Sequence, residues 1–406
     1  MRPIRPPATA RRPRTLAVAV LAVALLAVAA AVAPAAATAR PVPFGFAGVM
    51  IDGPMNAPGY DPSAEMDVMV ASGVESVRFA FHWVDGQPYR TAAEVPSWQR
   101  PLFRDLEGVP TTFHRFDPMV AGAAARGLRL LANVTTVPPW AAKYPSKFGS
   151  PPRSNAAYAG FVRELVRRYG PRGSFWAENP GLPYRPVRTW QLWNEPNLRY
   201  SWTDARWAGP YVRLLRAGRR AVKSVDRRAR IMLAGLPNVS WRDLDRIYRV
   251  RGARRLFDEV AIHPYTAPPG GVVTILERVR KVMRRHGDRR KPVAVTEFGW
   301  PSSKGKVKGI GVSTDRRGQA SRLRRALPLL VRNRKRLRLS SIYYYTWVTN
   351  DAPNTSIFYF AGLRHRLPSG EVVPKPAFHV YRSAALRMAK CQVKSTVATR
   401  CARPRR

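Results

Sequence analysis

The sequence predicts an α/β protein folded as a single (β/α)8 TIM barrel. Short β-rich runs alternate with long amphipathic stretches from residue 44 to residue 389, eight of each in strict order. Several of the short runs are wholly apolar, as expected for parallel strands that are covered on both faces. The 406-residue chain, with 45% hydrophobic residues and 11 Trp, can also supply one large core.

The expected elements follow one another without a missing unit. Predicted strands span residues 44–51, 74–81, 128–134, 187–193, 231–236, 260–263, 293–296 and 341–347. Predicted helices span residues 61–72, 117–127, 154–169, 206–225, 241–251, 272–286, 317–333 and 376–389. Eight such units fit a barrel with enlarged loops. A doubly wound open sheet is the alternative, but no G-x-G-x-x-G or G-x-x-x-x-G-K motif marks a phosphate-binding turn.

Two of the segments that join a strand to the next helix are unusually long, namely residues 83–115 and 135–154. Both follow the carboxyl ends of strands, where barrels place their active sites. Residues 171–186 are rich in Pro and Gly but precede a strand. We therefore expect them on the opposite face, with a structural role.

Residues 1–39 form a separate segment. It begins with a stretch that contains five Arg and no acidic residue, and residues 16–33 form an uninterrupted apolar run. Ala37-Thr38-Ala39 then fits the pattern of a cleavage site. We interpret 1–39 as a secretory signal and 40–390 as the barrel domain. An uncleaved membrane anchor is the alternative, because the run is almost long enough to span a bilayer. The sequence thus predicts a secreted, extracellular or cell-wall-associated protein.

Residues 391–406 form a short basic tail that contains both cysteines, Cys391 and Cys401. An exported chain meets oxidising conditions, so these two thiols could form a local disulfide. Two cysteines supply too few ligands for a metal site, and we expect no metal. We assign no regular structure to the tail.

The charge is strongly positive, with 70 Lys and Arg against 25 Asp and Glu, or +45. Without the five Arg of residues 1–39 it is still +40. Such a field attracts polyanions, for example anionic cell-wall polymers. Compositional bias is the alternative, because basic residues lie mostly on polar faces of predicted helices. We expect no nucleic-acid partner, since the sequence has no zinc finger or RNP element.

Two acidic residues lie at the ends of apolar strands. Glu195 belongs to Trp193-Asn194-Glu195-Pro196, and Glu297 belongs to Thr296-Glu297-Phe298-Gly299-Trp300. Carboxylates are rarely buried without partners, so each position needs an explanation. Cleavage of a glycosidic bond requires such a pair, with one group protonated and the other ionised. Apolar neighbours of Glu195 favour its protonated form, and Arg78 and Tyr265 are candidate donors to Glu297.

The spacing of the two glutamates agrees with one barrel. They are 102 residues apart and end the fourth and seventh predicted strands, so three units averaging 34 residues separate them. This is close to the usual size of such a unit, ~30 residues or more. Strands four and seven face each other across a barrel mouth, where carboxyl groups could approach to ~5–5.5 Å, the separation for double displacement. A buried structural carboxylate is the competing interpretation for each motif.

These two motifs resemble the acid/base and nucleophile motifs of clan A glycoside hydrolases. Within that clan the chain most resembles bacterial members of glycoside hydrolase family 39 and cellulase-like family 5, over residues 44–388. The resemblance implies a (β/α)8 fold, a carbohydrate substrate, retention of configuration, and no metal or organic cofactor. The high positive charge and the loop at 350–366 depart from the family pattern.

The resemblance also assigns substrate-binding positions. Arg78 matches the strand-two arginine that orients the nucleophile, and Asn194 matches the residue that hydrogen-bonds the sugar 2-hydroxyl. His263 and Tyr265 match the pair beside the nucleophile. Trp347 matches the strand-eight tryptophan under the bound sugar. Packing is the alternative role for Arg78, His263 and Trp347.

Together these features predict an exported retaining glycoside hydrolase, with Glu195 as acid/base and Glu297 as nucleophile. Two other functions stay open: a catalytically silent barrel that binds carbohydrate or cell wall, and a basic scaffold for anionic wall polymer. The sugar, the linkage and endo or exo action cannot be read from the sequence. A monomer is the default expectation.

Overall fold

A computed structural model of the chain describes residues 40–57, 60–309, 311–352 and 356–402. The predicted signal segment, residues 1–39, lies outside the described residues. Within the described ranges, no helix has both the length and the apolar character needed to cross a membrane. The fold described below belongs to the unit Pro41–Arg406.

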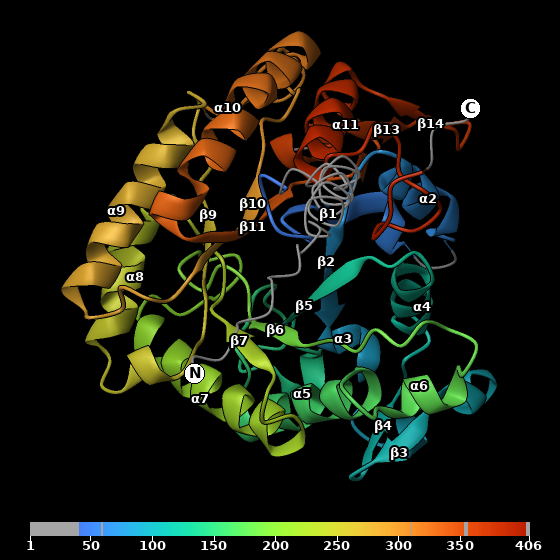
Figure 1. Ribbon diagram of the computed structural model, residues 1–406. Coiled ribbons are helices and arrows are strands. Elements are labelled where there is room, and N and C mark those ends of the chain that lie inside the picture. Colours follow the sequence, from blue (N-terminus) through green and yellow to red (C-terminus); the bar gives the residue numbers. More distant parts are fainter. Residues whose placement is uncertain (1–39, 58–59, 310, 353–355, 403–406) are drawn as a thin grey trace, which may run out of the picture. The chain divides into compact units, whose positions relative to one another are not determined.

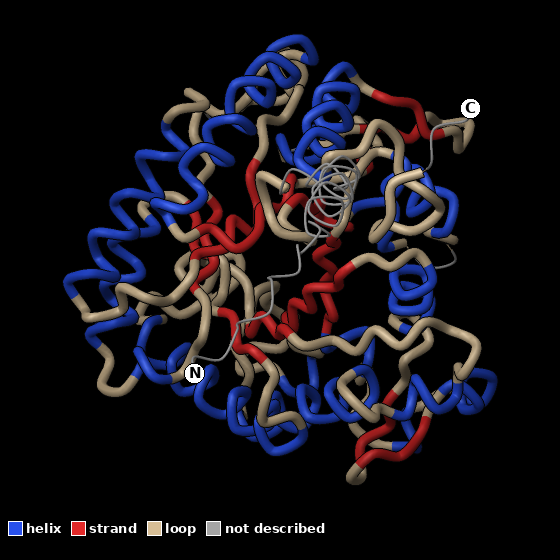
Figure 2. The backbone as a smooth tube through the Cα atoms, viewed as in Figure 1, coloured by secondary structure: helices blue, strands red, loops and turns tan. Residues whose placement is uncertain are grey.

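A curled sheet of nine strands forms the centre, and every paired strand in it is parallel to its neighbour (Figures 1 and 2). Its order is β7-β6-β5-β2-β1-β11-β10-β9-β8. The strands are β1 (Ala47–Ile51), β2 (Ser76–His82), β5 (Arg129–Thr135), β6 (Thr189–Leu192), β7 (Arg230–Met232), β8 (Leu236–Pro237), β9 (Val260–His263), β10 (Val293–Phe298) and β11 (Leu339–Tyr344). The architecture is of the α/β barrel type.

The two ends of this strand order are neighbours in the chain. Only residues 233–235 separate β7 from β8, so the predicted strand 231–236 is split in two. Two parallel bridges also involve this segment: Asn194 pairs with Gly235, and Met232 pairs with Glu259. The segment from β7 to β8 therefore pairs with β6 on one side and with β9 on the other.

Helices surround the sheet (Figures 1 and 2). They are α2 (Ser63–Ala71), α4 (Asp117–Ala125), α5 (Asn155–Tyr169), α7 (Ala208–Val225), α8 (Ser240–Arg249), α9 (Gly271–Arg285), α10 (Arg316–Leu337) and α11 (Pro376–Ala389). Side-chain caps begin two of them: the side chains of Ser154 and Asp315 accept backbone hydrogen bonds at the first turns of α5 and α10. These eight helices agree with the predicted ranges to within about four residues, as is usual for helix ends.

The long connections contain further short elements. Additional helices are α3 (Trp83–Gly86) and α6 (Ser174–Glu178). Short 3-10 helices are η1 (Gly53–Asn56), η2 (Ala92–Glu94), η3 (Ser97–Leu102), η4 (Pro139–Ala141), η5 (Ala253–Arg255) and η6 (Ile357–Phe360). The described residues also form two small sheets. One is the hairpin of β3 (Arg104–Leu106) and β4 (Val109–Thr111), and the other contains β12 (Val348–Thr349), β13 (Arg364–Arg366) and β14 (Val372–Pro374).

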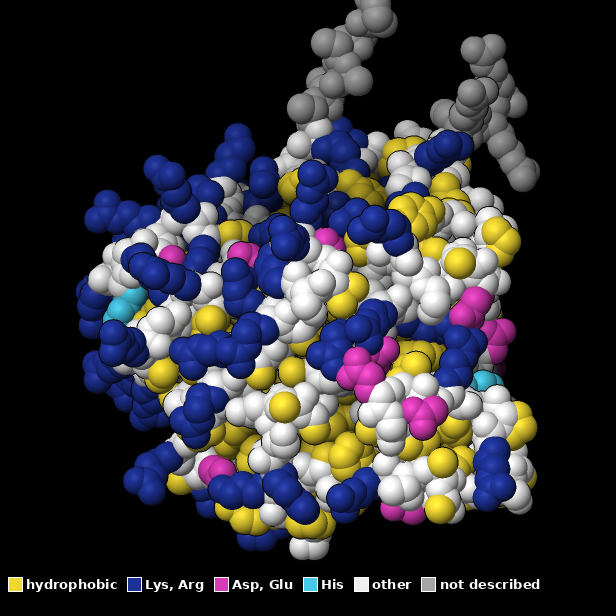
Figure 3. Space-filling model, turned by 90° about the horizontal axis from the view of Figure 1, so that it is seen from below, with side chains coloured by type: hydrophobic (Ala, Val, Ile, Leu, Met, Phe, Trp, Pro, Cys, Tyr) yellow, Lys and Arg dark blue, Asp and Glu magenta, His cyan; other side chains and the backbone are white. Residues whose placement is uncertain are grey.

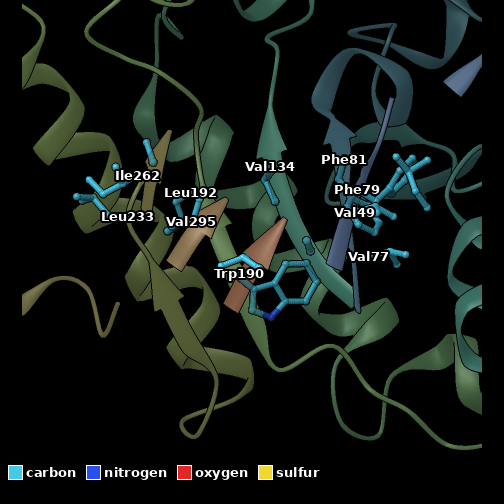
Figure 4. Packing of buried hydrophobic residues seen from close by; sticks show 14 of the residues in the cluster. Val49, Val77, Phe79, Phe81, Val134, Trp190, Leu192, Leu233, Ile262 and Val295 are labelled. Carbon is cyan, nitrogen blue, oxygen red and sulfur yellow. The ribbon is translucent and has the colours of Figure 1, made fainter. Parts of the chain in front are cut away.

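Side chains alternate between two environments along each strand of the central sheet. One set packs in the main core cluster, to which Val77, Trp190 and Val295 belong, as Figure 4 shows from close by. The other set forms a second, smaller cluster made of Leu131, Met232, Ala261, Ala294 and Tyr343. Such a pattern is expected when a curled sheet buries both of its faces.

Residues 391–402 pack against the barrel, although the sequence predicted no structure for them. Cys391 and Cys401 form a disulfide, with Cα atoms 5.3 Å apart. The buried ammonium group of Lys394 lies 2.7 Å from Glu75 Oε1, and the backbone of Ala398 donates to the carbonyl of Arg126. A buried ion pair and a covalent staple thus hold the tail beside the starts of β2 and β5.

Candidate active site

A cavity of about 660 Å³ lies at the carboxyl ends of the central strands. Its lining residues come from nearly all of these strands and from the loops that follow them. They are Met50, Asp52, Arg78, Ala80, His82, Val84, Asn133, Thr135, Thr136, Val137, Pro139, Ala142, Pro145, Ser146, Lys147, Phe148, Gly149, Ser150, Trp193, Asn194, Glu195, Tyr200, Ser201, Tyr265, Glu297, Tyr345 and Phe358. The long connection 135–154 supplies much of one wall, whereas 83–115 contributes only Val84.

The two predicted carboxylates meet in this cavity. One carboxylate oxygen of Glu195, one of Glu297 and one ring nitrogen of His263 all lie within 4.8 Å of one another. Glu195 follows β6 and Glu297 lies near the end of β10, and the four strands β5, β2, β1 and β11 lie between β6 and β10 in the sheet. The side chains therefore reach the same point from opposite sides of the curled sheet.

A local irregularity in β10 turns Glu297 into the cavity. Val293 and Val295 belong to the main core cluster, so regular alternation would send residue 297 to the same side. The pairing with β11 shifts between Val295 and Phe298, where three steps along β10 match two steps along β11. One extra residue of this kind is a β-bulge, which re-aims a side chain. Phe298 then rejoins the main core and Glu297 faces inward.

Arg78 fixes the position of Glu297. Its guanidinium group is fully buried and donates to Glu297 Oε1 at 2.7 Å. The same group donates to Gln191 Oε1 and to Asn194 Oδ1, each at 2.7 Å. Because the carbonyl oxygen of Asn194 is occupied in this way, its amide nitrogen is left for other contacts in the cavity. Tyr265 is the second donor to Glu297, with its hydroxyl 3.0 Å from Oε2.

Glu195 has an apolar, enclosed setting with two polar contacts. The Tyr200 hydroxyl donates to Oε2, and His263 Nδ1 lies 2.7 Å from Oε1. Burial raises the pKa of Glu195 to about 7, while the hydrogen bond from Tyr200 and the charge of Arg78 act in the opposite direction. A carboxyl group with this pKa carries a proton in a large fraction of molecules at neutral pH.

The backbone around Glu195 is strained. Trp193 and Glu195 have φ values of 77° and 45°, in the left-handed region that residues other than Gly rarely adopt. Each such residue costs of order 1 kcal/mol or more. Trp193 is buried and packs edge-on against Tyr158 and Trp202, and this packing holds the unusual turn in place.

His263 lies behind the two carboxylates. It is fully buried, and burial lowers its pKa to about 4, so the ring is neutral at pH 7. Its Nδ1 is 2.7 Å from Glu195 and 3.5 Å from Glu297. The other ring nitrogen has no partner among the described residues and faces Gly235, where a Cβ atom would lie only 1.9 Å from Nε2. The ring fits only because residue 235 has no side chain.

Trp347 is not brought to the cavity. Its ring is fully buried, its indole nitrogen donates to Glu65 Oε2 at 2.7 Å, and it packs against Phe378. Tyr345 lines the cavity instead, and its hydroxyl donates to Asp52 Oδ2 at 2.6 Å. Regular pairing of β11 ends at Tyr344, and a cis peptide joins Tyr345 to Thr346. The family resemblance named Trp347, whereas Tyr345 is the aromatic residue of this segment that lines the cavity.

Other cavity residues were missed by the sequence analysis. Asp52 follows β1 and His82 is the last residue of β2, so their position at a strand end could have indicated them. Tyr200 lies on a loop, and no pattern in the sequence predicts its contact with Glu195. The surrounding loops are joined by a hydrogen bond of 2.9 Å from the Tyr144 hydroxyl to Asp204.

Glu195, His263 and Glu297 are also the residues that could offer ligand atoms to a metal ion. The guanidinium group of Arg78 is already 2.7 Å from Glu297 and is fully buried. A divalent cation at this point would face that charge at short range in a poorly screened site. The trio is better explained as a hydrogen-bonded acid and carboxylate pair.

Solved protein structures share this fold. A family 39 glycoside hydrolase from Bacteroides cellulosilyticus WH2 matches 85% of this chain with a TM-score of 0.60 at 20% identity. A monomeric β-xylosidase from Caulobacter crescentus CB15 matches 85% with a TM-score of 0.59 at 20% identity. The GH53 catalytic domain of Ignisphaera aggregans matches 84% with a TM-score of 0.54 at 19% identity.

The match covers 64%, 68% and 97% of those three chains, so the protein spans about two thirds of the first two. No protein-family model matches the sequence, and no curated protein sequence matches it. In fold, the chain is thus similar to family 39 enzymes and to other glycoside hydrolases of the same clan.

Proposed function

We propose that the protein is a retaining glycoside hydrolase that cleaves O-glycosidic bonds by double displacement. The observation that carries this proposal is the approach of the Glu195 and Glu297 carboxylates to within 4.8 Å. Retaining enzymes hold these groups ~5–5.5 Å apart, whereas inverting enzymes leave ~6.5–9.5 Å for a water molecule. The likeness in fold to glycoside hydrolases supports the same activity.

In the first step, Glu297 attacks the anomeric carbon and the bond to the leaving oxygen breaks. Glu195 gives its proton to that oxygen, which departs as an alcohol. The raised pKa of Glu195, about 7, suits a proton donor, and the donors Arg78 and Tyr265 orient the carboxyl group of Glu297. The product is a glycosyl ester of Glu297.

In the second step, the ionised Glu195 removes a proton from water, and the water oxygen attacks the anomeric carbon. The ester bond breaks and Glu297 leaves as a carboxylate. His263 Nδ1 lies 2.7 Å from Glu195 Oε1, and the neutral ring can donate its Nδ1 proton to the ionised Glu195. Asn194 has an amide nitrogen available for a sugar hydroxyl.

The central sheet of this enzyme is proposed to be a closed (β/α)8 barrel. Closure is supported by the segment from β7 to β8, which pairs with β6 at one side and β9 at the other. A closed barrel explains why residues from opposite strands, such as Arg78 and Glu297, can touch.

The reacting sugar is proposed to be neutral. Of the charged side chains that line the cavity, Asp52, Glu195 and Glu297 are acidic, and Arg78 and Lys147 are basic. The Arg78 charge is committed to Glu297, and Asp52 lies near the reacting carboxylates through Tyr345. A sugar carboxylate beside Glu195 and Glu297 would face these acids with Arg78 already paired, and the other cation of the lining, Lys147, lies on the connection 135–154.

The test is hydrolysis of aryl glycosides and polysaccharides by the wild type, Glu195→Ala and Glu297→Ala. We expect each variant to lower kcat/KM by at least ~10³-fold on any substrate that the wild type cleaves. Glu164→Ala is the matched control, because it removes a buried carboxylate from α5, outside the cavity. No hydrolysis on a broad panel, with sugar binding retained, would instead favour the catalytically silent binding barrel.

Secretion and a monomeric state remain proposals. Residues 1–39 support export through their basic start, apolar run and cleavage pattern. One structural neighbour is a monomeric β-xylosidase, which is in keeping with a monomer here. Edman sequencing of the exported protein, beginning at Arg40, would test the cleavage site.

A further inference from the structure

On the face shown in Figure 3, basic side chains far outnumber acidic ones. One group of them lines a hollow of about 710 Å³ beside the starts of β9 and β10. This basic hollow is formed by residues 254–258 and by residues 284–291. Seven Lys and Arg side chains line it, against two acidic ones.

The two acidic residues of the basic hollow already have partners. Asp288 Oδ2 accepts hydrogen bonds from the Tyr248 hydroxyl and from Lys291, both at 2.8 Å. Asp258 Oδ2 accepts a hydrogen bond from the backbone of Ile231 at 2.8 Å. These carboxylates thus serve internal contacts and do not neutralise the remaining guanidinium groups.

Four arginines of the hollow are left without an anion. Arg255, Arg284, Arg289 and Arg290 are exposed, and no carboxylate among the described residues lies within 4.0 Å of their guanidinium groups. The surrounding charge also acts on buried Arg280, whose pKa is lowered by burial and then by Arg338 and Arg284. Positive charge therefore accumulates here without internal compensation.

The backbone that presents these arginines is fixed. Arg280 is 5% exposed and donates to the carbonyl oxygens of Lys291, at 2.8 Å, and Arg289, at 2.5 Å. Arg338 Nε donates to the carbonyl of Arg290 at 3.0 Å. A segment held at three successive carbonyls needs little further ordering when a ligand binds.

The hollow lies at the opposite end of the strands from the cavity. Residues 287–291 precede β10, and Glu297 lies near its carboxyl end. At ~3.3 Å per residue, a strand of this length separates the two sites by roughly 15–20 Å. A ligand in the hollow would therefore leave the cavity open.

We propose that the basic hollow binds an anionic polysaccharide as a second, non-catalytic site. Guanidinium groups form paired hydrogen bonds with carboxylate and phosphate oxygens, and four of them together fit a chain with repeated anionic groups. Nucleic acid fits less well, because single strands bind by stacking bases on aromatic rings. The aromatic side chain of the lining, Phe257, is buried, and Lys291 covers its ring at 4.2 Å.

The test compares two variants of the full chain that each lose four charges. The hollow variant carries Arg255→Gln, Arg284→Gln, Arg289→Gln and Arg290→Gln. The control variant carries substitutions of exposed arginines on α7 and α10: Arg213→Gln, Arg220→Gln, Arg324→Gln and Arg325→Gln. We expect the hollow variant to bind an oligogalacturonate of about ten residues at least ~10-fold more weakly, and the control variant less than ~3-fold, because local charge outweighs screened distant charge.

The pair Arg289→Gln and Arg290→Gln should give an intermediate loss, and its thermal unfolding checks that the fold is intact. Equal weakening in both quadruple variants would overturn the proposal, because it would assign binding to the general charge of the surface. Tighter binding of a single-stranded oligonucleotide of equal charge would also overturn it.

Binding is measured in Glu297→Ala as well, so it is tested even if no substrate is hydrolysed. Conversely, the hollow variant should cleave a neutral aryl glycoside at the wild-type rate. The outcomes for the two sites are therefore separable.

Discussion

Among the described residues, a buried basic side chain is paired with an acidic partner at one end of the central strands, and several exposed ones are left without such a partner at the other. At the carboxyl ends, the buried cation Arg78 is matched by Glu297, and further hydrogen bonds orient it. At the amino ends of β9 and β10, four exposed arginines have no carboxylate partner in the described part of the chain. The net charge of the chain, +45, thus does not describe the cavity, whose lining contains three acidic and two basic side chains.

This difference separates two functions, polymer binding and bond cleavage, that could not be assigned to different sites from the sequence. A strong positive field can attract and retain an anionic polymer. This attraction acts over distance and weakens as the salt concentration rises. Bond cleavage depends on a few groups with fixed geometry in an enclosed site. We propose the first task for the basic hollow and the second for the cavity with Glu195 and Glu297.

The largest effect is expected when the matched charge in the cavity is broken. Arg78→Met leaves Glu297 buried without its cation and releases Asn194, so kcat/KM should fall by ~10³-fold. Loss of the buried pair should also destabilise the fold by ~3–5 kcal/mol. Kinetics and thermal unfolding measure the two effects.

Arg168→Met is the control for this prediction. Arg168 is 3% exposed and pairs with Asp117 and Glu178, away from the cavity. This variant should lose stability without a matching loss of kcat/KM. A kcat/KM for Arg78→Met within tenfold of the wild type would contradict the role given to Arg78.

A smaller effect is expected when the support of the acid is disturbed. In Gly235→Ala, the new Cβ would meet His263 Nε2 at 1.9 Å, so the ring must leave its present position beside Glu195. We expect kcat to fall by ~10–100-fold, since small misplacements of catalytic groups cost rate on this scale.

Gly160→Ala provides the matching control on α5, because a Cβ there has no atom within 4 Å. It should keep kcat and raise stability by ~0.5–1 kcal/mol through helix propensity. Equal activity in both variants would show that the position of His263 is not needed for catalysis.

Tyr200→Phe should shift the pH profile rather than abolish activity. The Tyr200 hydroxyl donates to the ionised form of Glu195 and so lowers the pKa of this carboxyl from the value that burial alone would give. Removing the hydroxyl raises that pKa, so the alkaline limb of kcat/KM, expected near pH 7, should move upward by ~0.5–1 unit. Tyr184→Phe, at an exposed position outside the cavity, should leave the limb in place. A downward shift for Tyr200→Phe would contradict the assignment of Glu195 as the acid.

The smallest effect on activity is expected from the tail. Cys391→Ser with Cys401→Ser removes a staple across a sequence separation of 10 residues. Unfolding free energy should fall by ~2–3 kcal/mol, mainly through the greater entropy of the unfolded chain. Because the tail contacts the amino ends of the strands, kcat/KM should stay within about twofold. Thermal unfolding with and without a reductant checks the first statement, and a large loss of activity would contradict the second.

Much of the fold could be predicted because each main helix and strand is encoded by the residues of its own segment. The strand at Val260–His263 and the helix at Pro376–Ala389 were predicted with the observed bounds. Apolar runs and 3.6-residue periodicity encode such elements within a few residues of sequence. The small sheets were missed, since short strands such as β12 depend on partners distant in the chain.

The candidate site was predictable where a residue lies at a strand end, as Glu195 and Glu297 do. The bulge before Phe298, which turns Glu297 inward, left no signal in the sequence. The same holds for Gly235, whose importance comes from His263 on the neighbouring strand β9. Trp347 was named from the family resemblance alone, and after β11 ends at Tyr344 the chain places the Trp347 ring in the core and Tyr345 in the cavity.

The most direct test of the paired carboxylates is the configuration of the first product, followed by proton NMR during hydrolysis. The wild type should release a sugar with the same anomeric configuration as the substrate. With Glu297→Ala and added azide, the product should be a glycosyl azide of the opposite configuration, because azide replaces the missing nucleophile in a single displacement. An inverted first product from the wild type, or no azide adduct from an otherwise folded Glu297→Ala, would contradict the double-displacement account.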